Sequence, residues 1–327
     1  MAPIKYGQIG VGHAHANKIR AYCDSGDYDV VGIVEPNEEL KRAAQQSDTY
    51  RDLPFVSEEQ LLNTAGLQVV GVETPVRDLL ATAKRCIAAG MHIHLDKPAG
   101  ASLPHFRKLL DEAARQHLAV QMGYMYRYNP AIVQLRQLLK NGWLGEVFEV
   151  HAVMSKMGNP AMRKDIAEFS GGTMFELGCH LIDLVHGILG NPDKVTPFPR
   201  HSAADADNLM DNMLAVFEYP KATATVRTSI VEVDGFARRH LAVCGTKGTM
   251  HIQPLDRPTA RLAFSEPHGR FMKGYQDVDF PKYSRYLDDA ADLAKVIRHE
   301  KDADFSYEHD YEVQRSVLLA SAMPTLS

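Results

Sequence analysis

Three ionisable residues stand at helical spacing in the apolar segment FELGCHLIDLVHG, residues 175–187. Glu176, His180 and Asp183 follow one another at intervals of four and three residues, so at about 100° per residue they share an arc of roughly 60° on an α-helix. A metal site, a buried histidine tied to a carboxylate, or a catalytic imidazole with a supporting acid would each account for them. His186 points about 120° away from His180, which argues against a metal site that has both histidines as ligands.

We favour the catalytic interpretation of this segment. An imidazole titrates near neutral pH, so His180 can take the proton of an alcohol while a hydride leaves its carbon. Glu176, four residues earlier, would orient the ring and stabilise its charged form.

A glycine-rich turn near the start of the chain, GQIGVGHAHANKI, has the context of a dinucleotide-binding site. It follows a strand pattern and precedes a helical one, where the backbone of a GxG turn approaches a pyrophosphate and a helix N-terminus faces the charge. A tight turn without a ligand is the alternative. We predict cofactor contacts from Gly10, Gly12, His13, Ala14 and His15, the last of which stands where the usual third glycine would be.

Glu35 ends the second predicted strand, 25 residues after Gly10. A carboxylate at this place accepts hydrogen bonds from the adenosine ribose hydroxyls and repels a 2′-phosphate. A solvated strand end is the alternative. We therefore predict NAD as the cofactor in preference to NADP.

The stretch HIHLDKPAG adds a candidate amine. Strand alternation directs His92, His94 and Asp96 to one side and Lys97 to the other. The two histidines lack further ligands at zinc-like spacing, so we expect no metal. Lys97 stands at the carboxyl end of a strand, where open α/β sheets bind ligands, and its ammonium can hold a substrate oxygen. An exposed loop lysine is the alternative.

Two sets of elements would position these residues. Apolar strand patterns alternate with helical patterns up to about residue 123, which indicates an open, doubly wound parallel sheet covered on both faces. Beyond a connecting helix at 129–142, strand patterns joined by tight turns such as Gly245–Gly248 indicate a mainly antiparallel sheet. We predict an NAD-binding domain over 1–123 and a substrate-binding and oligomerisation domain over 124–327, with helices at 175–187, 286–299 and 307–323.

Composition excludes several classes of protein. The net charge is −5 and basic residues are scattered, which argues against nucleic acid as a partner. No segment reaches the roughly 18 uncharged apolar residues of a membrane helix, and the N-terminus lacks a secretory pattern. The four cysteines form no CxxC pair and indicate neither disulfides nor zinc. We expect a cytoplasmic protein.

Six segments, in order, resemble those of one oxidoreductase family: GVG, VVGVETP, GMHIHLDKP, MYRYNP, GGTMFELGCHLID and CGTKGTM. The chain resembles the glucose–fructose oxidoreductase, inositol dehydrogenase and rhizopine-catabolism family over nearly its whole length. The resemblance implies an N-terminal Rossmann domain and a C-terminal α+β domain. It also implies that the large open sheet of the second domain forms the interface of a homodimer or homotetramer.

The resemblance also implies roles for single residues. The Glu-Lys-Pro motif of the family falls on Asp96, Lys97 and Pro98, with the lysine catalytic. Its Asp-x-x-x-His pair falls on Glu176 and His180, with the histidine as acid/base. Asp96 is one methylene shorter, and Glu176 one longer, than the usual residues.

Further matches concern cofactor and substrate contacts. Thr74 and Pro75 match the loop beside the cofactor, and Asp96 and Lys97 are included among the cofactor contacts. Asp183 matches an aspartate that touches substrate hydroxyls, and Arg127 matches an arginine at the domain junction. The predicted substrate-binding residues are Tyr124, Arg127, Asn159 and Asp183.

We expect an NAD(P)-dependent dehydrogenase that acts on a secondary alcohol of a sugar, cyclitol or related polyol. His180 would remove the hydroxyl proton and Lys97 would stabilise the substrate oxygen. Two alternatives stay open: a redox-neutral, NAD-assisted elimination or hydrolysis of a sugar, and a non-catalytic NAD-binding sensor or regulator.

Overall fold

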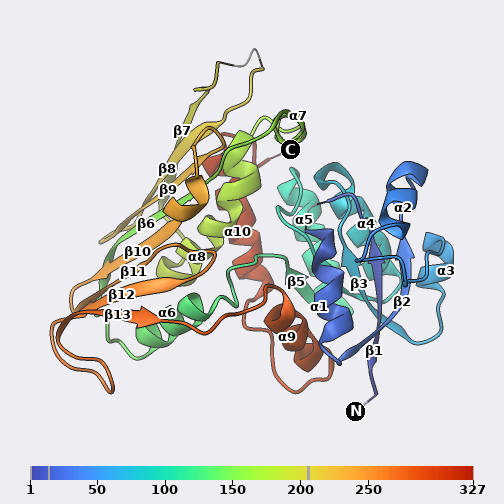
Figure 1. Cartoon of the computed structure of the whole chain (residues 1–327), viewed down its shortest axis with the longest axis horizontal. Coiled ribbons are helices and arrows are strands. Elements are labelled where there is room, and N and C mark those ends of the chain that lie inside the picture. Colours follow the sequence, from blue (N-terminus) through green and yellow to red (C-terminus); the bar gives the residue numbers. More distant parts are fainter. Residues whose placement is uncertain (1, 14, 205–206, 327) are drawn as a thin grey trace. The chain divides into compact units, whose positions relative to one another are not determined.

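The computed structural model describes residues 2–13, 15–204 and 207–326 (Figure 1). The chain divides into two compact units. The first contains the residues through Met125 together with Ser284–Tyr311, and the second contains Tyr126–Tyr283 and Glu312–Thr325. The segment Ser284–Tyr311 therefore belongs to the first unit although it follows most of the second in sequence.

The first unit is built on a five-stranded parallel sheet with the strand order β2-β1-β3-β4-β5. The strands are β1 (Ile4–Ile9), β2 (Tyr28–Val34), β3 (Leu67–Val72), β4 (His92–Leu95) and β5 (Val120–Met122). Nearly every residue of β3 and β4 is buried, as expected for strands covered on both faces. The doubly wound sheet predicted from the sequence is confirmed.

The helices of this unit are α1 (Ile19–Asp24), α2 (Glu38–Gln45), α3 (Glu58–Leu62), α4 (Val76–Ala88), α5 (Leu103–Arg115) and α9 (Leu287–Ile297). The side chains of Asn37 and Ser57 cap α2 and α3 by accepting backbone N–H groups. The helical segment that follows the glycine turn opens as a 3₁₀ turn, η1 (Ala16–Lys18), and continues as α1, which has six residues.

The core of the first unit includes a cluster of tyrosines. The rings of Tyr6 and Tyr22 stack with their centroids 4.1 Å apart, and Tyr28 packs edge-on against both. The hydroxyl of Tyr28 donates to the carbonyl oxygen of Ala290 at 2.7 Å, and Leu293 joins the same core. These contacts attach α9 to the sheet and explain why this late segment belongs to the first unit.

The second unit is built on an eight-stranded sheet with the strand order β13-β12-β11-β10-β6-β9-β8-β7. Its strands are β6 (Val147–Ser155), β7 (Lys194–Arg200), β8 (Asn212–Glu218), β9 (Thr223–Ser229), β10 (His240–Gly245), β11 (Gly248–Ile252), β12 (Thr259–Phe264) and β13 (Gly274–Asp279). All neighbours pair antiparallel except β6 and β9, which are parallel. The mainly antiparallel sheet predicted from the sequence is confirmed.

Helices of the second unit cover one face of this sheet. They are α6 (Pro130–Lys140), α7 (Pro160–Ile166), α8 (Cys179–Leu189) and most of α10 (Tyr307–Ala320), with the short turns η2 (Met174–Gly178) and η3 (Gly235–Arg238). Helix α8 packs on β6 and β9 (Figure 1). Strand β8 alternates buried with half-buried residues, which is the pattern of a sheet packed on one side. Among the described residues, no helix is long and apolar enough to cross a bilayer.

Candidate active site

A cavity of about 610 Å³ lies at the carboxyl ends of the first strands of the parallel sheet. Gly10, Glu35, Thr74 and Pro75 line it, so four of the predicted cofactor contacts share one space. Gly10 has φ +100°, and a Cβ there would lie 2.3 Å from the carbonyl oxygen of Glu73. Only glycine fits at this position, which brings the backbone of β1 directly against that of β3.

Glu35 is anchored at the edge of this cavity. Its Oε2 accepts from the backbone N–H of Val11 at 2.9 Å, and its Oε1 accepts from the backbone N–H of Asn37 at 2.9 Å. An ionised carboxylate has about four acceptor positions, so both oxygens retain capacity for the two hydroxyls of a ribose. The glycine turn and the fixed carboxylate fit a dinucleotide with its adenosine ribose at Glu35.

Lys18 is the centre of a buried charge cluster in the same unit. Its side chain, which comes from η1, has no exposed surface, and its Nζ lies 3.0 Å from Glu73 Oε1 and 3.1 Å from Asp96 Oδ1. It also lies 3.1 Å from His94 Nε2, while His94 Nδ1 lies 2.9 Å from Gln121 Oε1. We assign the Nδ1–H tautomer to His94, since Nε2 then accepts from the ammonium and Nδ1–H donates to the amide oxygen.

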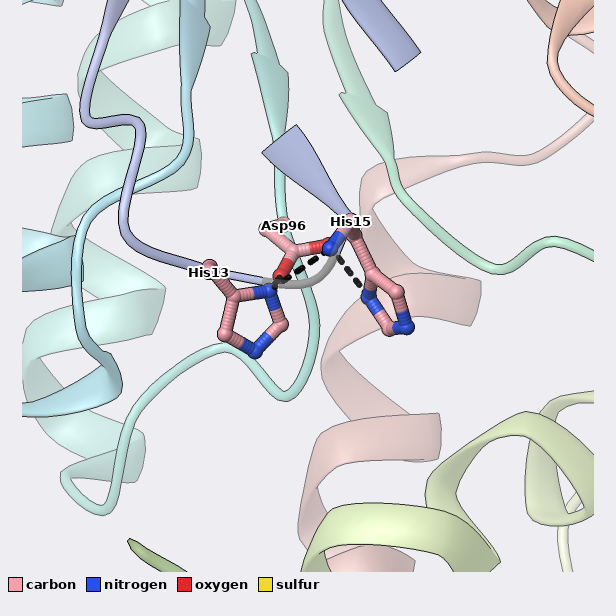
Figure 2. Close-up of side chains that lie close together, drawn as sticks. All are labelled: His13, His15 and Asp96. Carbon is pink, nitrogen blue, oxygen red and sulfur yellow. Dashed lines mark hydrogen bonds and ion pairs between the residues drawn. The ribbon is translucent and has the colours of Figure 1, made fainter. Parts of the chain in front are cut away.

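Two histidines of the glycine turn also contact Asp96 (Figure 2). His13 Nδ1 is 3.0 Å from Asp96 Oδ2, and His15 Nδ1 is 3.4 Å from Asp96 Oδ1. The two rings meet edge to face, with centroids 4.7 Å apart. Ala14, also predicted as a cofactor contact, lies outside the described residues.

The ligand atoms of His13, His15 and Asp96 all lie within 4.8 Å of one another, a spacing that three ligands of one metal ion can have. The ammonium of Lys18, however, lies 3.1 Å from the same carboxylate. A second cation on Asp96 would face this ammonium inside the protein, where like charges repel strongly. We therefore interpret the cluster as an ion-paired site rather than a metal site.

The pKa values of Glu73 and Asp96, the two carboxylates that contact Lys18, shift in opposite directions. Burial raises the pKa of Glu73 to about 7, although Lys18 opposes this. Burial also acts to raise the pKa of Asp96, but Lys18 and the two histidines outweigh it and hold that pKa well below its usual range. Burial lowers the pKa of His15 to about 4, with Asp96 opposing it. Burial, aided by Lys18, lowers the pKa of His94 to about 3.

Lys97 directly follows Asp96 and is 1% exposed. The alternative of an exposed loop lysine is therefore wrong. Tyr124, a predicted substrate contact in the same unit, is also buried. Both side chains belong to the first unit, whereas the remaining catalytic and substrate candidates belong to the second.

In the second unit, Glu176 and His180 lie on different kinds of helix. Glu176 is in η2, a π-helical turn, and His180 is in α8, which begins at Cys179. The arc of 60° expected from one continuous α-helix is therefore wrong, because a π-turn has more residues per turn. Such turns are frequent at functional sites. His180 is 1% exposed, and its ring lies edge-on to Tyr126 with centroids 5.9 Å apart.

The predicted substrate contacts of the second unit have structural partners within that unit. Arg127 and Asp183 are both 2% exposed and form a two-point ion pair: Nε lies 3.0 Å from Oδ2 and a terminal nitrogen lies 2.6 Å from Oδ1. Asn159 caps α7, its Oδ1 accepting from the backbone N–H of Met162 at 2.9 Å. Arg127 thus pairs with a buried carboxylate of its own unit.

The sequence analysis missed Lys18 and Glu73. The signals for them are weak: a lysine between Asn17 and Ile19 in a short helical pattern, and an acid at the end of the apolar run VVGV. Taken alone, each of these residues would be interpreted as exposed to solvent. Only the order of the strands shows that β1, β3 and β4 end side by side and that these two charges meet.

Family models match both halves of the chain. The model described as the oxidoreductase family with an NAD-binding Rossmann fold matches residues 4–124, and the GFO/IDH/MocA C-terminal domain matches residues 132–251. The chain belongs to this family of oxidoreductases, as the order of its motifs predicted. The first unit is therefore an NAD-binding Rossmann domain.

Characterised relatives are distant in sequence. The chain is 25% identical to trans-1,2-dihydrobenzene-1,2-diol dehydrogenase of Sus scrofa over 69% of this chain and 66% of that protein. It is 24% identical to the rhizopine catabolism protein MocA of Rhizobium meliloti over 58% of each. It is 25% identical to D-glucoside 3-dehydrogenase of Escherichia coli over 58% of this chain and 55% of that protein. These matches span about two thirds or less of each relative.

Solved structures share the fold over nearly the full length. Levoglucosan dehydrogenase, in complex with NADH and levoglucosan, has a TM-score of 0.83 at 16% identity and covers 98% of both chains. GenD2 from gentamicin A biosynthesis, in complex with NAD, has a TM-score of 0.80 at 19% identity and covers 98% of this chain and 95% of that one. At these identities the likeness establishes the fold alone.

Proposed function

We propose that this protein is a dehydrogenase that transfers hydride between a secondary alcohol of a sugar, cyclitol or related polyol and a nicotinamide. The observation that carries the proposal is the cavity that joins Gly10, Glu35 and the Thr74–Pro75 loop in a domain of the NAD-binding family. The names of the relatives, which include a D-glucoside 3-dehydrogenase, support a polyol as the substrate class.

We assign the chemistry to groups from both units. His180 takes the proton of the substrate hydroxyl and Lys97 donates a hydrogen bond to the same oxygen, so that negative charge developing there is stabilised. When bound, the nicotinamide accepts the hydride from the carbon that carries this oxygen. Glu176 is proposed to orient His180. Burial of Lys97 and His180, each 1% exposed, excludes bulk water from both groups.

We propose NAD as the preferred cofactor. Glu35 holds a fixed carboxylate at the cavity edge and would repel a ribose 2′-phosphate. Lys41 on α2, a cation of the lining, lies 3.4 Å from the carboxylate of Glu38 and is therefore already paired. Residues 1–123 are proposed to bind this cofactor and residues 124–327 to bind the substrate.

We also propose that the protein is a homodimer or homotetramer that associates through the open face of the eight-stranded sheet. Phe198 on β7 is 42% exposed and Tyr275 on β13 is 76% exposed. Residues that pair across adjacent strands have their side chains on the same face of the sheet. Followed from strand to strand, these pairs connect Phe198 with Val153 of β6, and Tyr275 with Glu149 of β6. Positions 149 and 153 of β6 face the same way, so both aromatic side chains do too.

A substrate screen tests the proposed reaction. The purified protein is mixed with sugars, inositols and sugar acids in the presence of NAD or NADP, and the absorbance of the reduced nicotinamide is followed. We expect reduced cofactor to accumulate with at least one polyol. Conversion of a sugar without accumulation would replace the proposal by a redox-neutral reaction, and cofactor binding without any conversion would replace it by a sensor.

A further inference from the structure

Two imidazoles stand in the turn that would face the phosphates of the cofactor. His13 and His15 follow the GxG glycines, and their side chains are each 22% exposed while that of Asp96 is 3% exposed. The histidines are therefore more accessible to solvent than the carboxylate that they contact. The close approach of the backbone depends on Gly10, and Nδ1 of His13 accepts the backbone N–H of His15 at 3.4 Å.

The cavity beside this turn lacks spare positive charge. Four carboxylates line it, from Glu35, Glu38, Glu58 and Asp78, against two cations from Lys41 and Arg85. Both cations are engaged: Lys41 lies 3.4 Å from a Glu38 oxygen, and Arg85 donates to both oxygens of Glu58. A pyrophosphate carries two negative charges, so a cation from another source would add to the attraction of the backbone N–H groups of the turn.

The helix that follows the turn supplies little of that charge. It opens with the three-residue 3₁₀ turn η1 and continues as the six-residue α1. The partial charge at a helix end is the sum of aligned peptide dipoles. This helix has few peptide dipoles, and its geometry changes from 3₁₀ to α at Ile19. The charge of Lys18 is already paired, because its ammonium contacts the carboxylates of Glu73 and Asp96.

Asp96 prepares both histidines for a second proton. Its Oδ2 lies 3.0 Å from Nδ1 of His13, closer than the backbone N–H of His15 at 3.4 Å, and its Oδ1 lies 3.4 Å from Nδ1 of His15. The carboxylate therefore favours the tautomer with hydrogen on Nδ1 and the lone pair on Nε2. A carboxylate on one nitrogen stabilises the imidazolium that forms when the other nitrogen is protonated. The protonated Nε2–H then becomes a donor for a phosphate oxygen.

We infer that His13 and His15 form a proton-accepting anion site, and that binding of a pyrophosphate-containing dinucleotide places a proton on this pair. The inference rests on the proposed function, since it takes the cofactor of that function as its ligand. The charged or titratable groups that face the pair are Asp96, Lys97, Lys18, Glu73 and His94. Lys97 and Lys18 oppose the extra proton, and Asp96 with the incoming phosphates favours it.

The sign of the pH effect follows from linkage. In the free protein burial lowers the pKa of His15 to about 4, so this ring is neutral near pH 6 to 7. A bound phosphate raises that pKa, because an opposite charge favours the protonated form. Between the two pKa values binding takes up one proton, and the affinity for NAD rises by about tenfold for each unit that the pH falls.

The test is calorimetric titration of the full chain with NAD at pH 6.5. The titration is repeated in buffers of different ionisation enthalpy, and the dependence of the observed heat on that enthalpy gives the number of protons taken up. We expect between half a proton and one proton for the wild type. The double variant His13→Gln/His15→Gln should take up almost none and should bind NAD about tenfold more weakly at this pH.

Two controls separate the possible outcomes. His105→Gln removes an exposed histidine of α5 and should leave the uptake unchanged, and adenosine, which has no phosphate, should bind the wild type without uptake. NAD binding without proton uptake, or uptake that survives in the double variant, would overturn the inference alone. Failure of the wild type to bind NAD and NADP at all would overturn the proposed function as well. Circular dichroism checks that the variants are folded.

Discussion

Arg127 and Asp183 hold each other in a two-point ion pair that is almost completely buried in the second unit. Arg127 precedes α6, and Asp183 lies on α8, one turn after His180. The pair therefore ties the helix that carries the proposed acid/base to the chain that enters the second unit. This gives both residues a structural role beside any contact with substrate.

Breaking this pair should destabilise the protein. Arg127→Met or Asp183→Leu leaves one charge buried without its partner, which costs about 3–5 kcal/mol. The double variant Arg127→Met/Asp183→Leu replaces both charges by apolar groups and should recover most of the loss. Urea denaturation of the four proteins measures the coupling, and simple additivity of the two single losses would contradict the importance of the pair.

Loss of the proposed catalytic groups should lower turnover but not cofactor affinity. His180→Ala and Lys97→Met should each reduce kcat by about 10²–10⁴-fold on whichever polyol the screen identifies. Binding of NAD, followed by fluorescence quenching, should stay within a few-fold of wild type for the histidine variant, because His180 belongs to the substrate unit. Near-normal kcat in either variant would remove that residue from the mechanism.

The preference for NAD should depend on Glu35. Glu35→Gln weakens hydrogen bonds to a charged group, each of which contributes about 1.5–3 kcal/mol, so NAD affinity should fall by about tenfold or more. Affinity for NADP should fall less, because the repulsion of the 2′-phosphate is removed. Asn37→Ala is the matched control, since it loosens the cap of α2 and leaves the carboxylate in place. An equal loss for both cofactors would show that Glu35 does not select between them.

Stability should depend on pH through Glu73. Burial raises the pKa of this carboxyl to about 7 in the folded protein, above its value in the unfolded chain. The folded state therefore binds the proton more tightly, and the stabilisation present at about pH 4.5 is lost as the pH rises to 7. Relative to Glu73→Gln, the wild type should have a lower Tm at pH 8 than at pH 5. Parallel Tm curves for the two proteins would show that Glu73 does not titrate in this range.

The contribution of Asp96 to the pH dependence of stability has the opposite sign to that of Glu73. Its pKa is held well below the usual range, so its contribution to stability is present above the pKa of an unfolded aspartate and is lost as the pH falls through the folded value. The Glu73→Gln comparison cancels this contribution, because both proteins retain Asp96.

The open face of the large sheet offers a separate test. Phe198→Asp or Tyr275→Asp places a charge on the proposed interface and should weaken self-association by about tenfold or more, while each subunit stays folded. Sedimentation velocity over a range of concentrations measures this. Val233→Asp is the matched control, because Val233 is 80% exposed and lies outside the named strands. A wild-type protein that sediments as a monomer at all concentrations would contradict the assembly.

Much of the fold follows from local patterns. Apolar strands that alternate with helices predicted the parallel sheet of the first unit, because period and burial are properties of neighbouring residues. The same reasoning placed Gly10 and Glu35 at strand ends, the family resemblance added the Thr74–Pro75 loop, and all of these residues line one cavity. The chemistry of a GxG turn is likewise local, since it depends on one backbone angle.

The charge cluster could not be predicted in this way. Lys18, Glu73 and Asp96 are far apart in sequence and meet only because β1, β3 and β4 lie side by side and end at the same edge of the sheet. Whether such residues are solvated or paired depends on burial, which the whole fold decides. The π-turn at Glu176 was also missed, because residue spacing assumes the regular helix that this turn interrupts.

By itself, the sequence determined the two kinds of sheet, the dinucleotide turn and the residue types available for chemistry, because each of these depends on residues that are neighbours in the chain. The tertiary structure alone decided which of these groups pair: Lys18 with Glu73 and Asp96, Arg127 with Asp183, and Asp96 with the imidazoles of the two histidines of the turn. The physical reason is that an ion pair depends on distance and burial in space, and neither is a property of separation along the chain.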